Sequence, residues 1–498
     1  MYWSNLLCDK RFSELLGREK SPDQPTALDF AQDQFRKPAE RDHDRILFST
    51  PFRRMGDKTQ VFPLESIESI RTRLTHSYEV ANLARSLGIE IAETLQDKLP
   101  DDAYRTIPAV LAAVGLAHDI GNPPFGHQGE KAIRAWFKRN SKALFETPRG
   151  GRAAEDIARL TEQHKNDFLN FEGNAQTLRV VTKLQVIGDD LGLNLTLGTL
   201  ASLMKYVGAS DTLDGSKQAR KKVGFFTSEQ ALVQRIRSEV GLEDGARHPL
   251  ALVMEACDDI AYSVLDAEDS IKKGLVSFND LIAWLKHQCD GDRVIEYVCA
   301  IADWEHKALA EQKLPPSELK DVSTQKFRVH AIHVMVSAVA KAFQDKYDSI
   351  ISGSFDGEAI KVSEASKLCS VLKRFDRENA FNHRTVLEIE LNGYNIINCL
   401  MDFLWMGISD REDYFKLGGE RTSVFSAYVY SRISKNYRRV FESTVTCYHK
   451  DDNLPIRYRE PQLLTDMISG MTDRFCIDLY NDLTEHYKEM RSINGTTA

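Results

Sequence analysis

The sequence lacks the features that mark several large classes of proteins. None of its apolar stretches approaches the ~20 residues needed to span a membrane. Its first residues show no basic region, apolar run and cleavage site of a signal peptide. Its eight cysteines have no CxxC spacing, which argues against a disulfide framework and a structural zinc site. We therefore expect a cytoplasmic protein with reduced thiols and no membrane partner.

Glycine and proline are also scarce, with 28 and 15 copies among 498 residues. Apolar residues recur at the helical period through most of the chain, and only one or two strands are expected, near residues 222–226. The composition, 42% hydrophobic and 28% charged, is that of a globular protein long enough to bury a large core. These patterns predict an all-α fold.

Three regions differ in their chemistry. Residues 1–50 are polar and contain three prolines, and we expect an N-terminal arm there. Residues 51–275 hold every motif described below, and residues 276–498 continue as a C-terminal helical region packed on that core. A glycine-rich basic loop is expected at 208–227, although the net charge of −8 argues against a general nucleic-acid coat. In the C-terminal region the apolar pattern predicts helices at 329–347, 359–373 and 463–487.

The segment from Leu116 to Glu130 places two histidines and two carboxylates around a turn. An apolar helix runs into His118-Asp119, prolines end that helix, and the next helix opens near Glu130. Imidazoles and carboxylates are ligands of first-row metals and act as acids and bases. The segment therefore favours a hydrolytic metal site, although a His-Asp pair alone occurs about once by chance in such a chain.

Two further segments extend this motif. Arg71–Ser77 opens an amphipathic helix in which Thr72 or Thr75 could be the cap. Residues 250–273 contain no glycine or proline and predict one long, largely buried helix. Its polar residues at four-residue spacing share one face, and buried acids are costly unless a cation or a polar ligand meets them. That face carries Asp258, Tyr262 and Asp266.

Each of these residues also has a purely structural interpretation. His76 could lie at a helix start without a ligand, His118-Asp119 could interact with a helix dipole, and Asp258 could pair with an arginine. Together these interpretations require independent coincidences at three places, so we favour a metal site.

The order and spacing of the motifs resemble the deoxyguanosinetriphosphate triphosphohydrolase family, within the HD phosphohydrolase superfamily and its His…His-Asp…Asp metal signature. The matching strings are Lys58–Leu64, Arg71–Ser77, His118–Glu130, Phe171–Gln176, Asp258–Tyr262 and, near the C-terminus, Gln462–Asp473. The resemblance implies an HD catalytic core at 51–275. It also implies metal-dependent hydrolysis of deoxynucleoside triphosphates, dGTP above all, at the α-phosphorus, releasing the deoxynucleoside and inorganic triphosphate.

The resemblance also assigns roles to residues. A divalent metal, Mn²⁺ or Mg²⁺ with Co²⁺ or Fe²⁺ as alternatives, suits the mixed nitrogen and oxygen ligands. The expected ligands are His76, His118, Asp119 and Asp258. His127 and Glu130, three residues apart, are expected to form the catalytic pair that moves a proton. The expected substrate contacts are Arg73, Lys205 and Lys222 to the phosphates, Tyr262 under the sugar, and Gln60 and Asp266 to the 3′-hydroxyl. Asn174 is expected to support the metal shell, and Arg421 to contact phosphate or a partner subunit.

Two other functions stay open from the sequence. One is a different HD phosphohydrolase, such as a nucleotidase or a cyclic-nucleotide or alarmone hydrolase; the other is a nucleotide or nucleic-acid sensor on an HD scaffold. The resemblance implies a homo-oligomer, often a hexamer, and in some members activation by nucleotide or single-stranded DNA. At 428–439, tyrosines could stack on the bases of single-stranded DNA and cations could contact its phosphates. We favour an ordinary helix face with buried tyrosines.

Overall fold

The computed structural model describes residues 1–18, 35–64, 67–147, 151–185, 191–443 and 454–495. The regular secondary structure of these residues is helical apart from isolated bridges, which confirms the all-α prediction. Of the strand expected near 222–226, only an isolated parallel bridge between Gly208 and Val223 forms. Within the described ranges, every helix is too short or too polar to cross a bilayer.

The N-terminal residues form short helices that lie on the helical core. Residues 19–34 of the expected arm, with Pro22 and Pro25, lie outside the described residues. The segments before the first long helix are α1 (Trp3–Leu6), α2 (Phe12–Leu15), α3 (Pro38–Leu47), α4 (Thr50–Arg54) and η2 (Met55–Asp57).

Long helices that pack closely carry the motifs. Gly115 lets α5 and α6 approach, because a Cβ at this position would lie 2.5 Å from the Ala81 Cα. The helix predicted at 250–273 is confirmed as α13. The elements of this region are α5 (Arg73–Thr94), η3 (Gln96–Lys98), α6 (Ala103–Ala117), α7 (Gly126–Phe145), α8 (Gly151–Ala158), α9 (Glu162–Leu169), α10 (Gly173–Arg179), η4 (Val180–Leu184), α11 (Leu197–Leu203), η5 (Gln218–Arg220), η6 (Thr227–Glu229), α12 (Gln230–Glu239) and α13 (Pro249–Lys272).

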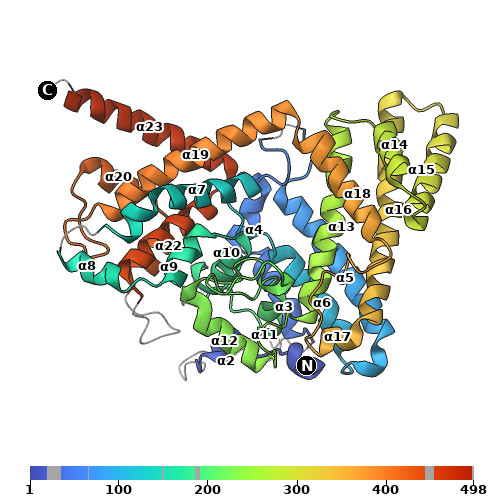
Figure 1. Cartoon of the computed structure of the whole chain (residues 1–498), viewed down its shortest axis with the longest axis horizontal. Helices are drawn as coiled ribbons and strands as arrows, with labels where there is room; N and C mark the ends of the chain where they lie inside the picture. Colours follow the sequence, from blue (N-terminus) through green and yellow to red (C-terminus); the bar gives the residue numbers. More distant parts are fainter. Residues whose placement is uncertain (19–34, 65–66, 148–150, 186–190, 444–453, 496–498) are drawn as a thin grey trace.

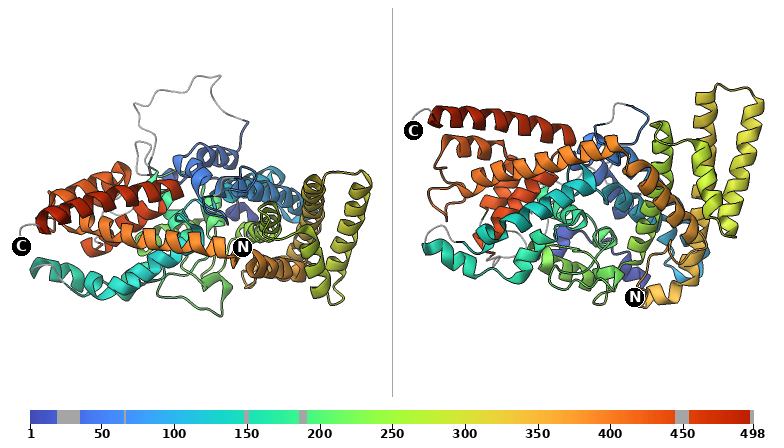
Figure 2. Two further views of the ribbon diagram at one scale, coloured as in Figure 1. Left: turned by 90° about the horizontal axis from the view of Figure 1, so that it is seen from above. Right: turned by 45° about the horizontal axis from the view of Figure 1, so that its top comes forward.

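The remaining helices cover two sides of this core. Figure 1 shows α14 and α15 at one end of the molecule and α23 running out at the other, with α5, α6 and α13 between them, and the views of Figure 2 agree. One cluster of buried apolar side chains extends from Trp3 to Leu483. The helices are α14 (Phe278–Gln288), α15 (Arg293–Glu311), α16 (Pro316–Asp345), α17 (Tyr347–Ile351), α18 (Ser366–Asp376), η7 (Arg377–Phe381), α19 (Arg384–Ser409), α20 (Val424–Arg432), α21 (Lys435–Glu442), α22 (Ile456–Ser469) and α23 (Asp473–Gly495).

All three predicted C-terminal helices have the wrong bounds. The helix predicted at 329–347 lies mostly within α16, which already begins at Pro316 and ends at Asp345. Residues 359–365 form turns, so the helix predicted from 359 begins at Ser366. The helix predicted at 463–487 is broken between α22 and α23, where Lys58 and Arg54 donate to the carbonyl oxygens of Ser469 and Gly470. Cationic side chains that satisfy terminal carbonyls are a usual way to end a helix.

Candidate active site

Two histidines and one carboxylate from three helices meet beneath a cavity. His76 lies in the first turn of α5, where Thr72 is the N-cap and forms a capping box with Thr75, as expected. His118 follows the last residue of α6, and Asp258 lies midway along α13. Potential ligand atoms of His76, His118 and Asp258 all lie within 4.8 Å of one another. We call these three residues the metal cluster.

The hydrogen bonds of the metal cluster suit a cation. The His118 Nδ1 lies 2.7 Å from the Gly115 carbonyl oxygen, which fixes the ring and leaves Nε2 toward Asp258. That Nε2 is buried and has no hydrogen-bond partner among the described residues, although it lies 3.5 Å from the Asp258 Oδ1. Burial disfavours charge on His118, but Asp119 and Asp258 raise its pKa to about 9. The carboxylates thus attract positive charge to a place where a divalent cation would replace the proton.

Asp119 borders the metal cluster without belonging to it. Its Oδ2 lies 3.6 Å from the His118 Nε2 and pairs with the Arg73 guanidinium, and its Oδ1 accepts a hydrogen bond of 2.6 Å from Asn122. Arg73, expected to contact phosphate, is therefore bound to a carboxylate here. Asp119 remains a predicted ligand.

The next helix supplies an acid/base pair. The His127 Nδ1 and the Glu130 Oε2 lie 3.3 Å apart in the first turn of α7. The other oxygen of Glu130 accepts a 2.9 Å hydrogen bond from the Gly173 amide. Burial opposes the charge of Glu130, but its bonds to His127 and Gly173 lower its pKa. Buried Glu130 and exposed His127 can therefore pass a proton between the cavity and solvent.

A cavity of about 320 Å³ joins these groups to basic and aromatic side chains. Lys205 lies 3.6 Å from the Asp258 Oδ2, and Lys222 lies 3.0 Å from the Glu172 Oε1. Asp258 and Glu255 raise the pKa of Lys205 despite burial, so this lysine is charged. Residues on the cavity wall that the sequence singled out are Gln60, Arg73, His118, Asp119, His127, Glu130, Asn174, Lys205, Lys222, Asp258 and Tyr262.

Asp266, an expected contact of the 3′-hydroxyl, does not line the cavity. It lies one turn beyond Tyr262 on α13 and is 1% exposed, with an Oδ2 that has no partner among the described residues. Burial and the neighbouring carboxyl of Asp376 raise the pKa of Asp266 well above its ordinary value. Its contact with a sugar hydroxyl stays a prediction.

The structure adds residues that the sequence analysis did not select. Lys373 of α18 lines the cavity and donates to the Asp259 Oδ1 at 2.6 Å. No motif marked Lys373, because it lies 114 residues from its partner in a part of the chain without recognisable strings. Glu172 was within reach of sequence reasoning, since it belongs to the string Phe171–Gln176 and contacts Lys222.

Two other expected contacts lie elsewhere. Arg421 donates to the carbonyl oxygens of Gly407 and Leu417 and stacks on Tyr430, so its guanidinium does not reach the cavity. In the 428–439 segment, Tyr430 and Tyr437 are buried, and Tyr428 donates to Asp482 at 2.9 Å. Stacking surfaces for bases are therefore few in this segment.

Comparisons with known proteins find relatives over most of the chain. The HD domain family model matches residues 73–187. A deoxyguanosinetriphosphate triphosphohydrolase-like protein of Listeria monocytogenes is 34% identical, over 97% of this chain and 99% of its own length. One from Pseudomonas aeruginosa is 32% identical over 89% and 92%. The deoxyguanosinetriphosphate triphosphohydrolase of Salmonella typhimurium is 31% identical over 89% and 93%.

Proposed function

The chain belongs to the deoxyguanosinetriphosphate triphosphohydrolase family, and from this premise we propose that it hydrolyses deoxynucleoside triphosphates in a metal-dependent reaction. The products are the deoxynucleoside and inorganic triphosphate, and dGTP is the preferred substrate. The observation that carries the proposal is the metal cluster, of which His118 and Asp258 line a cavity that also holds lysines and an acid/base pair, while His76 lies buried behind them.

The metal cluster would hold Mn²⁺ or Mg²⁺, with Co²⁺ or Fe²⁺ as alternatives. Two imidazoles and carboxylate oxygens, with no thiolate, favour these ions over structural zinc. Asp119 would complete the set by giving up part of its contact with Arg73. When bound, such a cation lowers the pKa of a coordinated water and polarises a phosphoryl oxygen.

The protein's own residues would bind the nucleotide and move the proton. Lys205 and Lys222 would neutralise phosphate oxygens, and Arg73 would join them when its guanidinium turns from Asp119. His127 would exchange a proton between substrate and solvent, with Glu130 holding its ring. Tyr262 would lie under the sugar, and Gln60 and Asp266 would bind the 3′-hydroxyl. Lys373, on the same wall, adds another positive charge.

The proposal includes assembly and location. We expect a cytoplasmic homo-oligomer, with a hexamer as the leading form. The seven described cysteines are free, and Cys447 lies outside the described residues. Binding of single-stranded DNA at 428–439 would depend on Tyr428, because only this one of the three tyrosines is partly exposed. If phosphates carry that binding, it weakens steeply with salt.

Product analysis tests the function directly. The protein is incubated with each deoxynucleoside triphosphate and Mn²⁺ or Mg²⁺, and the products are separated by ion exchange. Inorganic triphosphate supports the proposal, whereas orthophosphate or pyrophosphate indicates another HD phosphohydrolase. Nucleotide binding without turnover indicates a sensor. Asp258→Asn, which replaces the carboxylate of the metal cluster, is the matched control, and we expect it to lose most of the activity.

A further inference from the structure

Two strings from opposite ends of the chain meet beside the cavity. The first begins at Lys58, and the second, Gln462–Asp473, runs from the middle of α22 to the first residue of α23. Lys58 is 4% exposed and Asp473 is 2% exposed, so both charged groups lie inside the protein. Neither residue lines the cavity or has a role in the proposed reaction. Buried charges of this kind need a structural explanation.

Lys58 joins the end of α22 to the turn between His118 and α7. Its Nζ donates to the carbonyl oxygen of Ser469 at 2.6 Å and to that of Asn122 at 2.7 Å. Burial lowers the pKa of Lys58 to about 7, and the amine can donate both bonds in either protonation state. Asn122 in turn donates to the Asp119 carboxylate.

Asp473 holds the other end of the same turn. Its Oδ1 accepts from the Phe125 amide at 3.0 Å, and its Oδ2 accepts from the Thr59 amide at 2.9 Å and from the Thr59 hydroxyl. Phe125 has a φ of 59°, a left-handed conformation that a bulky residue adopts only when its surroundings hold it. Its ring packs on Gly393, where a Cβ would lie 2.6 Å from the ring. His127 follows two residues later.

These contacts continue into the cavity wall. The Thr59 carbonyl oxygen accepts from the Nε and Nη2 of Arg73, at 3.2 and 3.0 Å, and Arg73 pairs with Asp119. Gln60, the neighbour of Thr59, lines the cavity. In the described structure no member of the metal cluster hydrogen-bonds to Lys58 or Asp473.

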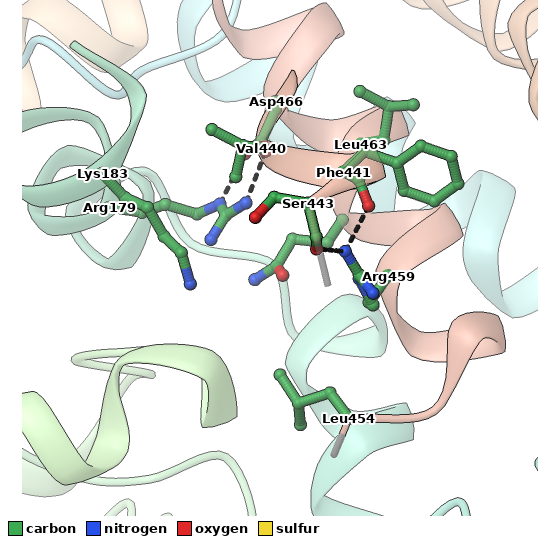
Figure 3. Close-up of a pocket in the computed structure, with 10 residues that line it drawn as sticks. Arg179, Lys183, Val440, Phe441, Ser443, Leu454, Arg459, Leu463 and Asp466 are labelled. Atoms are coloured by element: carbon green, nitrogen blue, oxygen red, sulfur yellow. Dashed lines mark hydrogen bonds and ion pairs between the residues drawn. The ribbon is translucent and has the colours of Figure 1, made fainter. Parts of the chain in front are cut away.

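Helix α22, whose last residue accepts the hydrogen bond from Lys58, is itself held in place by other contacts. Asp466 of α22 accepts from the Nε and Nη2 of Arg179, both at 2.7 Å (Figure 3). It also accepts from Gln176 of α10 at 2.9 Å. The space beside this pair is about 30 Å³, room for roughly one water molecule and too small for a nucleotide. The Arg179–Asp466 ion pair is therefore a structural contact between α10 and α22 rather than a second binding site.

We propose that Lys58 and Asp473 are positioning residues that set the turn from Asp119 to His127 against Thr59 and Arg73. The C-terminal helices would thus align the acid/base pair and the phosphate contacts with the metal cluster without touching the substrate. This inference rests on the proposed function, because alignment matters only if the cavity carries out hydrolysis.

Asp473→Asn tests the inference with little change of volume. An amide nitrogen cannot accept a hydrogen bond, so Thr59 or Phe125 loses its acceptor. We expect kcat to fall by about 10²-fold, the scale of a misalignment of about 1 Å. We expect the affinity for Mn²⁺ to change by less than about threefold, because the metal cluster is not held by Asp473. Asp478→Asn, an exposed change on the same helix, is the control and should match the wild type.

Hydrogen exchange provides a readout that does not need turnover. The peptide containing Phe125 should exchange faster in Asp473→Asn than in the wild type or Asp478→Asn. If Asp473→Asn does not fold, Thr59→Val, which removes one of three donors, should show the same changes in milder form. Unchanged kcat in a folded Asp473→Asn protein would overturn the inference, as would loss of Mn²⁺ affinity equal to the loss of kcat. If the wild type hydrolyses no nucleotide, the proposed function fails, and the exchange rate alone supports or overturns the positioning role.

Discussion

At the scale of single residues, the paired side chains of His127 and Glu130 differ widely in solvent exposure. The His127 side chain is 75% exposed, whereas that of Glu130 is 4% exposed, although they form one pair. In such a pair the buried carboxylate orients the imidazole ring, and the exposed ring can exchange protons with solvent.

We expect His127→Ala to lower kcat by roughly 10²–10⁴, the usual contribution of a general acid or base. The metal content should stay at the wild-type level, because the ring is not part of the metal cluster. Steady-state kinetics and elemental analysis measure the two quantities. His287→Ala, at another exposed histidine, is the control. A variant without metal would instead make His127 a ligand or a support of the ligands.

Sugar selection is the second residue-scale prediction. Asp258 and Tyr262 lie one turn apart on α13, so the metal cluster and the wall under the sugar keep a fixed distance. A ribonucleotide would press its 2′-hydroxyl against Tyr262, and an unpaired buried hydroxyl costs ~1–3 kcal/mol. We expect kcat/KM for dGTP to exceed that for GTP by at least about tenfold.

In the same assay Tyr262→Ala should narrow this ratio, whereas Tyr104→Ala, at an exposed tyrosine, should leave it unchanged. Equal use of GTP and dGTP by the wild type would show that α13 does not select the sugar.

The sequence was sufficient for residues that lie close together in a motif, but not for partners that packing brings together. The spacing predicted a His127–Glu130 pair, because three residues make one helical turn. The pairing of Arg73 with Asp119 depends on how α5 packs on α6, and the contact of Lys373 with Asp259 depends on α18 lying beside α13. Periodicity within one helix carries no information on either contact.

At the scale of elements, the start of α13 depends on a buried neutral histidine. His248 is the N-cap, and its Nδ1 accepts from the Leu250 amide at 3.1 Å. Its Nε2 lies 3.1 Å from the Leu6 carbonyl oxygen, to which it donates as the neutral tautomer. Burial lowers the pKa of His248 from 6.5 to about 4.

This pKa predicts a loss of stability in acid. In the unfolded chain His248 takes up a proton near pH 6.5, whereas the folded protein resists it down to about pH 4. Stability is therefore lost as pH falls through this window, by up to about 3 kcal/mol. Calorimetry at pH 7.5 and 5.0 should show a larger fall in Tm for the wild type than for His248→Asn, which keeps a capping side chain. Equal falls would exclude His248 as the cause.

Helix boundaries were less predictable than helices. The α5 start was readable because Thr72 and Thr75 form a local capping box. The break after α22 was not, because the groups that end the helix, Arg54 and Lys58, lie more than 400 residues away in sequence. Local propensity could not reveal a stop imposed from that distance.

At the scale of the whole molecule, the proposed homo-oligomer predicts a particle mass. Light scattering under assay conditions should give a multiple of the 56.5 kDa chain mass, with six as the expected number. A particle of 56.5 kDa that is fully active would contradict the assembly proposal. The sequence predicted an all-α fold but not the placement of α14 and α15 at one end and α23 at the other (Figure 1), because tertiary placement depends on contacts between distant faces.

The hydrogen bond between Thr59 and Asp473 joins residues 414 positions apart, which sets a time order during synthesis. At roughly 5–20 residues per second, Thr59 leaves the ribosome about 20–80 s before its acceptor. During that interval the nascent chain gains His76, then His118 and, about halfway through, Asp258, but not yet the carboxylate that holds Phe125. The growing polypeptide can thus gather its metal cluster before Asp473 is made and become a competent catalyst only near the end of translation.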